Sequence, residues 1–151
     1  MPSKSGDHSY AELRPPGLGN GVRSGVILGV DDDPLNVKLT KALVEGLGYL
    51  FIGAASGAEA LQMLQTVRRQ VILLDIMMPG MDGFETCRRI RQMFQGAGPR
   101  IIYLTAHNMV EDVKHALETD ADDYLVKPLQ MSVLDTRLRH WMSQLPRAAA
   151  V

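Results

Sequence analysis

The sequence lacks several features that would mark common classes of protein. It contains a single cysteine, Cys87, which excludes an internal disulfide and fits a reducing cytosol. No apolar run approaches the ~20 residues that a membrane-spanning helix needs. The net charge is −1, so no charge excess points to nucleic acid or to an acidic membrane surface. These absences predict a cytoplasmic protein that contacts neither nucleic acid nor membrane directly.

Motifs for nucleotide and zinc binding are also missing. No Gly-rich loop is followed by Lys and Ser or Thr, so nucleotide binding has no support. The histidines and Cys87 show no zinc-ligand spacing. Residues 1–25 are rich in Pro, Gly and Ser and have no apolar core or cleavage pattern, which indicates a flexible tail rather than a signal peptide.

What the sequence does contain is a regular alternation of strand-like and helix-like segments. Short apolar runs predict five strands, and segments of helical periodicity lie between and after them. The alternation predicts an α/β fold of the (βα)₅ type, in which helices cover both faces of a doubly wound, five-stranded parallel sheet. The domain is predicted to span residues 26–145, with a short C-terminal tail at 146–151. The strands are expected at 26–30, 49–55, 71–75, 100–105 and 123–127.

Local signals predict where the helices begin and which faces they bury. Asp33 before Pro34 is typical of a helix cap. Capping-box spacing recurs at Ser56–Glu59, Asp82–Glu85 and Asn108–Glu111. A last helix is expected from about Ser132 to Gln144, with Leu134, Leu138 and Trp141 directed inward. The first helix is expected to be amphipathic, with one apolar face formed by Leu35, Leu39, Ala42, Leu43 and Leu47. The basic runs at 67–69 and 88–91 are expected on solvated helix faces.

Polar residues gather at the ends of four predicted strands. Asp31, Asp32 and Asp33 follow the first strand, Asp75 ends the third, Thr105 ends the fourth and Lys127 ends the fifth. Ligand chemistry in parallel α/β sheets takes place beyond these carboxyl ends. Converging carboxylates repel one another and need a cation, and oxygen ligands are those that Mg²⁺ prefers. Together with a carboxylate nucleophile, a hydroxyl and a lysine, such a site suits phosphoryl transfer.

Four stretches in order, "VILGVDDDPLN", "VILLDIMMPGMDG", "IIYLTA" and "DDYLVKP", make the chain resemble a bacterial response-regulator receiver domain. The resemblance implies a flavodoxin-like sheet with strand order 2-1-3-4-5. Asp75 then matches the phosphoacceptor, and Asp31 and Asp32 match the acidic pair that binds Mg²⁺, for which Mn²⁺ could substitute. The backbone carbonyl of Met77 would complete the protein ligands.

The remaining matches concern the response to phosphorylation. Thr105 matches the switch hydroxyl, Lys127 the lysine that pairs with the phosphoryl oxygens, and Tyr124 the aromatic rotamer switch. The family's Lys127–Pro128 bond is typically cis. The resemblance implies a histidine kinase or a histidine phosphotransfer protein as partner. It also implies a homodimer face on the fourth helix, the fifth strand and the fifth helix, although Val133 stands where a charged residue is common. Such a domain catalyses its own phosphorylation and dephosphorylation rather than turnover of an external substrate.

Several alternatives remain open from the sequence. A shift of one residue would make Asp32 and Asp33 the acidic pair. A haloacid-dehalogenase-type phosphatase also uses an Asp nucleophile, but it needs a second Asp where this chain has Met77. A receiver-like scaffold that is never phosphorylated is the other rival. The output partner is unknown, and the sequence fits a stand-alone receiver as well as a domain of a hybrid kinase or larger regulator.

Overall fold

The computed structural model describes residues 25–66, 71–117 and 120–147, and its central feature is a parallel five-stranded sheet. The strands follow the order β2-β1-β3-β4-β5, as the resemblance implies. Their bounds are β1 Val26–Val30, β2 Leu50–Ala54, β3 Val71–Asp75, β4 Arg100–Thr105 and β5 Asp123–Val126. All residues of β1 and β3 are buried, which explains why both read as continuous apolar runs.

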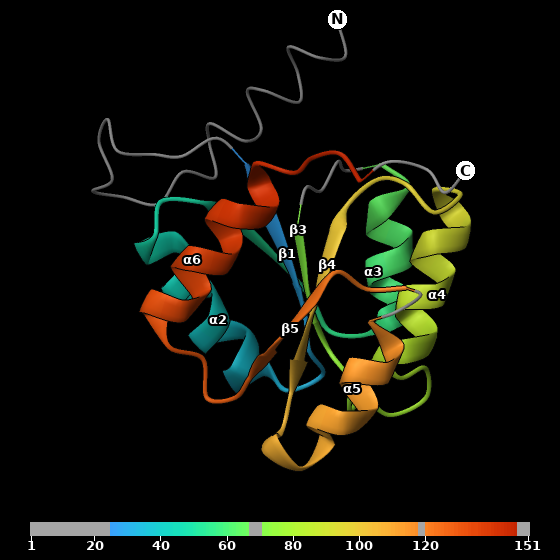
Figure 1. Cartoon of the computed structure of the whole chain (residues 1–151), viewed down its shortest axis with the longest axis horizontal. Coiled ribbons are helices and arrows are strands. Elements are labelled where there is room, and N and C mark those ends of the chain that lie inside the picture. Colours follow the sequence, from blue (N-terminus) through green and yellow to red (C-terminus); the bar gives the residue numbers. More distant parts are fainter. Residues whose placement is uncertain (1–24, 67–70, 118–119, 148–151) are drawn as a thin grey trace, which may run out of the picture.

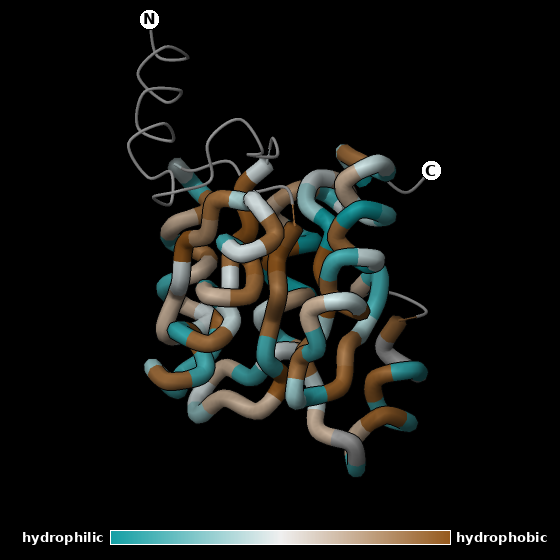
Figure 2. Tube along the Cα trace, turned by 90° about the vertical axis from the view of Figure 1, so that its left-hand side faces the viewer, coloured by the Kyte–Doolittle hydropathy of each residue, from teal (hydrophilic) through white to brown (hydrophobic). Residues whose placement is uncertain are grey.

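Helices cover both faces of this sheet (Figure 1). One face carries α2 (Pro34–Gly46) and α6 (Met131–Met142), and the other carries α3 (Gly57–Leu64), α4 (Gly83–Met93) and α5 (Val110–Ala116). Each face has its own apolar core, which contains Val44 and Leu138 on the first and Cys87 and Ile90 on the second. In Figure 2 the hydrophobic colour runs through the central strands, and the hydrophilic colour gathers in the helices and loops around them. The doubly wound prediction is confirmed.

Most of the predicted helix starts are confirmed. The side chains of Asp33, Ser56 and Asp82 each accept a hydrogen bond from a backbone N–H in the first turn of the helix that follows. The prediction for Asn108 is wrong, because this residue lies inside a short 3₁₀ helix, His107–Met109, and α5 begins only at Val110. The tighter turn takes up the residues that were expected to form the cap and first turn.

The predicted buried face of the first helix is wrong in part. Leu35 and Leu39 are 62% and 56% exposed, whereas Thr40 and Val44 are buried. Val37 also packs on the core of this face, so the buried stripe follows the 37, 40, 44 spacing instead. The helix therefore has two apolar stripes, and only one of them faces the sheet.

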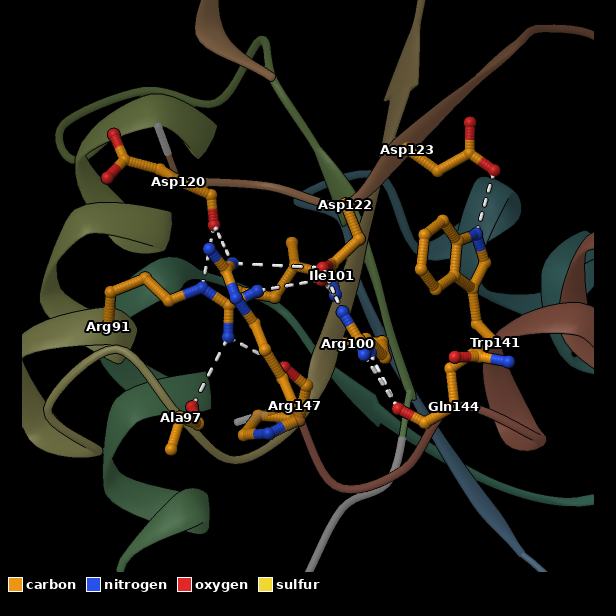
Figure 3. A network of polar contacts seen from close by, with 11 residues as sticks. Arg91, Ala97, Arg100, Ile101, Asp120, Asp122, Asp123, Trp141, Gln144 and Arg147 are labelled. Carbon is orange, nitrogen blue, oxygen red and sulfur yellow. Dashed lines mark hydrogen bonds and ion pairs between the residues drawn. The ribbon is translucent and has the colours of Figure 1, made fainter. Parts of the chain in front are cut away.

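Arg91, expected on a solvated helix face, is instead 6% exposed and lies at the amino ends of β4 and β5. Its guanidinium donates to the carboxylate of Asp122 at 2.8 Å and to the carbonyls of Pro99 and Asp120 at 2.6 Å each. Arg100 donates to the other oxygen of Asp122 at 2.8 Å (Figure 3). The prediction failed because the partners of Arg91 come from distant parts of the sequence. The other predicted basic run, 67–69, lies outside the described residues.

A third arginine joins this group from the end of the chain. Arg147 forms an antiparallel bridge with Gly98 and donates to the carbonyl of Asp120 at 2.8 Å (Figure 3). Its guanidinium also lies 3.8 Å from Asp122. We call Arg91, Arg100 and Arg147 with Asp122 the arginine cluster. It joins the segment after α6 to the amino edge of the sheet.

Candidate functional site

The opposite edge of the sheet, where the strands end, brings together the predicted polar residues. Asp31 directly follows β1, and its N–H donates to the carbonyl of Ala54 at 3.1 Å. Asp75 is the last residue of β3, and β1 and β3 are paired neighbours. The sheet order reverses at this pair, because β2 lies beyond β1 and β4 lies beyond β3. The acids therefore occupy the topological switch point, where α/β proteins place their ligands.

Three carboxylates form the centre of the site. Oxygens of Asp31, Asp32 and Asp75 all lie within 4.8 Å of one another, and we call these residues the acidic cluster. Asp31 and Asp75 are 5% and 6% exposed, whereas Asp32 is exposed. Asp33 points elsewhere, since its carboxylate caps α2 by accepting from the N–H of Leu35 at 3.0 Å. Of the two pairings considered from the sequence, the geometry thus favours Asp31 with Asp32.

Lys127, the first residue after β5, provides a positive charge. Its ammonium donates to Asp75 at 2.9 Å and to Asp31 at 3.2 Å. Burial works to lower the pKa of Lys127, but the hydrogen bond and charge of Asp75, with the charge of Asp31, raise it overall. Burial raises the pKa of Asp75, and the contact with Lys127 only partly offsets this effect. The Lys127–Pro128 peptide bond is cis, as the resemblance implies.

The charges of this site do not balance. Three carboxylates face one ammonium, and like charges at such distances are costly when two of them are buried. A divalent cation would neutralise the excess. The donor set, made of carboxylate oxygens with one member open to solvent, fits a hard ion such as Mg²⁺, which retains several waters.

The two residues predicted to respond to phosphorylation, Thr105 and Tyr124, lie on β4 and β5. Thr105 ends β4, is 2% exposed and donates from its hydroxyl to the carbonyl of Ala106 at 3.1 Å. Tyr124 lies beside Tyr103 in the β4–β5 pairing and packs, half-buried, against the core beneath α4 and α5. The structure thus brings Asp31, Asp32, Asp75 and Lys127 into one cluster. It leaves the hydroxyl of Thr105 bonded to a backbone carbonyl.

The loop after β3 exposes one methionine near the site and lets α4 begin close to Asp75. Met77 is 65% exposed, whereas Met78 is buried. The N–H of Gly83 donates to the carbonyl of Ile76 at 2.8 Å. A Cβ atom at Gly83 would collide with the backbone of Asp75 and Ile76, so glycine is required for α4 to begin this close to the acid.

Sequence reasoning also missed an apolar groove beside the acidic cluster. The groove has a volume of about 630 Å³ and lies between α2 and the segment after β5. Its walls include Leu39, Leu43, Leu104 and Leu129, and Lys127 connects it to the site. The second apolar stripe of α2 was the signal that could have revealed it, because a helix with two such stripes exposes one of them.

The chain is similar to known proteins over most of its length. Residues 27–139 match the family model described as "Response regulator receiver domain". Among curated proteins, the transcriptional regulatory protein AfsQ1 of Streptomyces coelicolor is 48% identical over 109 residues, which is 72% of this chain and 47% of that protein. The sensor histidine kinase GacS of Pseudomonas protegens is 34% identical over 122 residues, which is 79% of this chain and 13% of that kinase. The chain thus spans about half or less of these relatives.

Solved structures agree with this result. The receiver domain of the Francisella response regulator 1452 is 30% identical with a TM-score of 0.71, and the match covers 80% of this chain and 98% of that one. The chemotaxis protein CheY4 of Vibrio cholerae is also 30% identical with a TM-score of 0.71, covering 78% and 98%. Among the described residues, no helix has the length and apolar character that crossing a membrane requires.

Proposed function

Because the chain belongs to the response regulator receiver domain family of two-component signalling, we propose that it is a switch that is phosphorylated on Asp75. The donor is the phosphohistidine of a histidine kinase or of a histidine phosphotransfer protein. One observation carries the proposal: Asp75 ends a buried strand beside Asp31 and Asp32, and Lys127 contacts it at 2.9 Å. This combination supplies a nucleophile, a cation site and a counter-charge.

The chemistry is a transfer between two side chains. A carboxylate oxygen of Asp75 attacks phosphorus, and the bond between phosphorus and the imidazole nitrogen breaks as the new P–O bond forms. The imidazole nitrogen keeps the electron pair, and the product is an aspartyl phosphate. Mg²⁺ held by Asp31, Asp32, Asp75 and the carbonyl of Met77, or Mn²⁺ in its place, would neutralise charge on the phosphoryl oxygens. Lys127 pairs with those oxygens from its position beside Asp75.

The added charge then shifts the conformation of the domain. A phosphoryl group on Asp75 offers the hydroxyl of Thr105 an acceptor that competes with the carbonyl of Ala106. When Thr105 turns toward it, the start of the loop after β4 and the packing around Tyr124 change. Phosphorylation shifts the equilibrium only by the difference in its interactions with the two conformations.

The partners follow from the same proposal. The phosphohistidine donor is the first partner. The second is another copy of the chain, which can pair at the changed face formed by α5, β5 and α6. Asp123 on β5 already binds Arg137 on α6 at 2.6 Å, and Val133, in the first turn of α6, is 41% exposed. A protein partner or a further domain of a longer chain reads the change.

Phosphoryl incorporation tests the proposal directly. The chain is incubated with a small-molecule acyl phosphate and Mg²⁺, and its intact mass is measured. We expect a gain of one phosphoryl group, which is lost when a chelator removes the metal or when Asp75→Asn removes the nucleophile. Asp123→Asn is a matched control, since this acid lies at the start of β5 and should not affect labelling.

Each rival function predicts a different result. An inert scaffold gives no Mg²⁺-dependent mass gain with any donor. A phosphatase of the haloacid-dehalogenase type turns over an external phosphate ester, but Met77 stands where such enzymes need a second acid. Labelling that persists in Asp75→Asn would contradict the assignment of the nucleophile.

A further inference from the structure

The segment after α6 folds back onto the loop that precedes β4. The backbone N–H of Arg147 donates to the carbonyl of Gly98 at 2.9 Å, and the N–H of Gly98 donates to the carbonyl of Arg147 at 3.1 Å. The two residues form an antiparallel bridge, although Arg147 lies beyond residues 27–139, which match the receiver family. We call residues 144–147 the strap.

Side chains of the arginine cluster hold the strap in place (Figure 3). Two guanidinium nitrogens of Arg100 donate to the carbonyl of Gln144, at 2.8 and 2.9 Å, and Arg147 donates to the carbonyl of Asp120 at 2.8 Å. The side chains of Arg100 and Arg147 are 17% and 23% exposed, whereas that of Arg91 is 7% exposed. Because water reaches the contacts of the strap more easily, the strap should open before the buried part of the cluster does.

The strap continues directly from α6, and the C-terminal half of this helix is tied to β5. The indole N–H of Trp141 donates to Asp123 at 2.9 Å. Arg137 donates to the same carboxylate at 2.6 Å and to the carbonyl of Tyr124 at 3.2 Å. Arg100, which binds the strap, also lies over the ring of Trp141, 5.0 Å from its centroid. One arginine therefore contacts both the strap and α6, so that a movement of either affects the other.

We propose that the strap is a lock on α6, which holds the helix in its position on β5 while the bridge between Arg147 and Gly98 is closed. When the bridge opens, the C-terminal half of α6 gains freedom to move. The response to phosphorylation changes the packing around Tyr124, so the closed strap favours the unphosphorylated conformation. Opening of the strap and phosphorylation of Asp75 then favour each other reciprocally. This coupling rests on the proposed function, whereas the lock depends only on the contacts of the strap.

Hydrogen exchange of the full chain tests the lock without any phosphorylation. Arg147→Met removes the guanidinium and keeps an unbranched side chain. We expect several-fold faster exchange in peptides from the C-terminal half of α6 and from the loop at Gly98, because a charged hydrogen bond that closes the strap is lost. Exchange in α3, which packs on the other face of the sheet, should stay as in the parent. Unchanged exchange in α6, or equal acceleration in α3, overturns the proposal.

A matched control and a second readout come from α6 itself. Arg139→Met removes an exposed arginine that pairs with Asp135 within the helix, and it should leave exchange unchanged. Trp141 is the one tryptophan of the sequence, so its fluorescence reports on this part of the fold. Quenching by acrylamide should increase in Arg147→Met and stay at the parent level in Arg139→Met. Equal quenching in the three proteins, or equal acceleration of exchange in the two variants, overturns the proposal.

A measurement on the parent chain decides the case if Arg147→Met does not fold. Exchange of the backbone amides of Gly98 and Arg147 is followed by NMR and corrected for their intrinsic rates. We expect equal protection of the two amides, because one opening of the bridge exposes both. Protection that differs between them overturns the proposal.

Phosphorylation tests the coupling and separates it from the proposed function. At a limiting concentration of an acyl phosphate with Mg²⁺, Arg147→Met should carry more phosphoryl group on Asp75 than the parent does. Equal labelling of the two proteins overturns the coupling. Faster exchange in Arg147→Met without any labelling of Asp75 would leave the lock standing and remove the signalling function. Labelling of Asp75 with parent-like exchange in Arg147→Met would do the reverse.

Discussion

The two edges of the sheet carry clusters of the same residue types with opposite charge balance. At the amino edge, Asp122 is surrounded by three arginines, and at the carboxyl edge one lysine contacts two of three clustered carboxylates. The surplus arginine charge is bonded within the fold, because Arg91 and Arg100 also donate to backbone carbonyls such as those of Pro99 and Gln144. A carboxylate surplus needs donors or cations, and over residues 25–66, 71–117 and 120–147 Lys127 is the one cation bound to the acidic cluster.

A structural polar cluster differs from a functional one in whether contacts within the fold satisfy its charges. The arginine cluster is complete, since Asp122 accepts from Arg91, from Arg100 and from the N–H of Ile101. Such a network holds α4, β4 and the segment after α6 together and needs no ligand or ion to balance its charges. The acidic cluster is incomplete within the fold, and its excess charge is what makes it suited to a metal and a phosphoryl group.

The same substitution, Asp to Asn, should therefore lower stability at the amino edge and not at the carboxyl edge. Asp122→Asn removes the charge that Arg91 and Arg100 share, and we expect it to lower the free energy of unfolding by about 3 kcal/mol, as when one partner of a buried ion pair is lost. Asp32→Asn is the matched control at the acidic cluster, and it should leave stability unchanged or raise it by relieving repulsion. Urea unfolding of the metal-free variants measures both changes in the free energy of unfolding. Equal losses in the two variants would contradict the difference between the two clusters.

Water access also distinguishes the two edges, because the proposed phosphoacceptor lies at the carboxyl edge beside an exposed loop residue. Met77 is exposed beside the proposed phosphoacceptor and cannot orient an attacking water. Met77→Asn supplies an amide that can do so, and we expect several-fold faster loss of the phosphoryl group after the donor is removed. Phosphate release over time measures this rate, with Met93→Asn, at an exposed methionine of α4, as the control. No acceleration in Met77→Asn would show that this side chain does not limit hydrolysis.

The smallest expected effect is a difference in the pH dependence of stability. Burial raises the folded-state pKa of Asp75 above its ordinary value of 3.8, so the folded chain binds a proton more tightly than the unfolded chain. Stability of the metal-free parent should therefore fall as the pH rises from about 4 through the folded-state pKa. Asp75→Asn lacks this loss, so its free energy of unfolding should rise relative to that of the parent over the same pH window. Unfolding of both proteins at several pH values, with a chelator present, measures the difference between their free energies of unfolding. A difference that does not change with pH would contradict a raised pKa of Asp75.

Local signals predicted most of the fold and the acidic cluster, since strands, caps and strand ends depend on neighbours in sequence. Asp33 and Asp82 cap their helices because capping needs only the next few residues. Asp31 and Asp75 meet because parallel strands end at one edge.

The errors arose where distant residues decide. The partner of Arg91 lies 31 positions away, and no helical pattern reveals it. Either of the two apolar stripes of α2 could pack on the sheet, and the helical pattern alone does not show which one does. Leu39 was therefore predicted on the buried face although it is exposed. The groove beside Lys127 forms only when α2 and the segment after β5 come together.

The position of the phosphoryl group is the most direct test of phosphorylation on Asp75. After incubation with an acyl phosphate donor and Mg²⁺, borohydride reduces an aspartyl phosphate to homoserine, and fragmentation of the peptides identifies the modified position. We expect reduction at Asp75, with Asp31, Asp32 and Asp122 left as aspartate. Reduction at Asp31 or Asp32 instead, or at none of these residues, would contradict it.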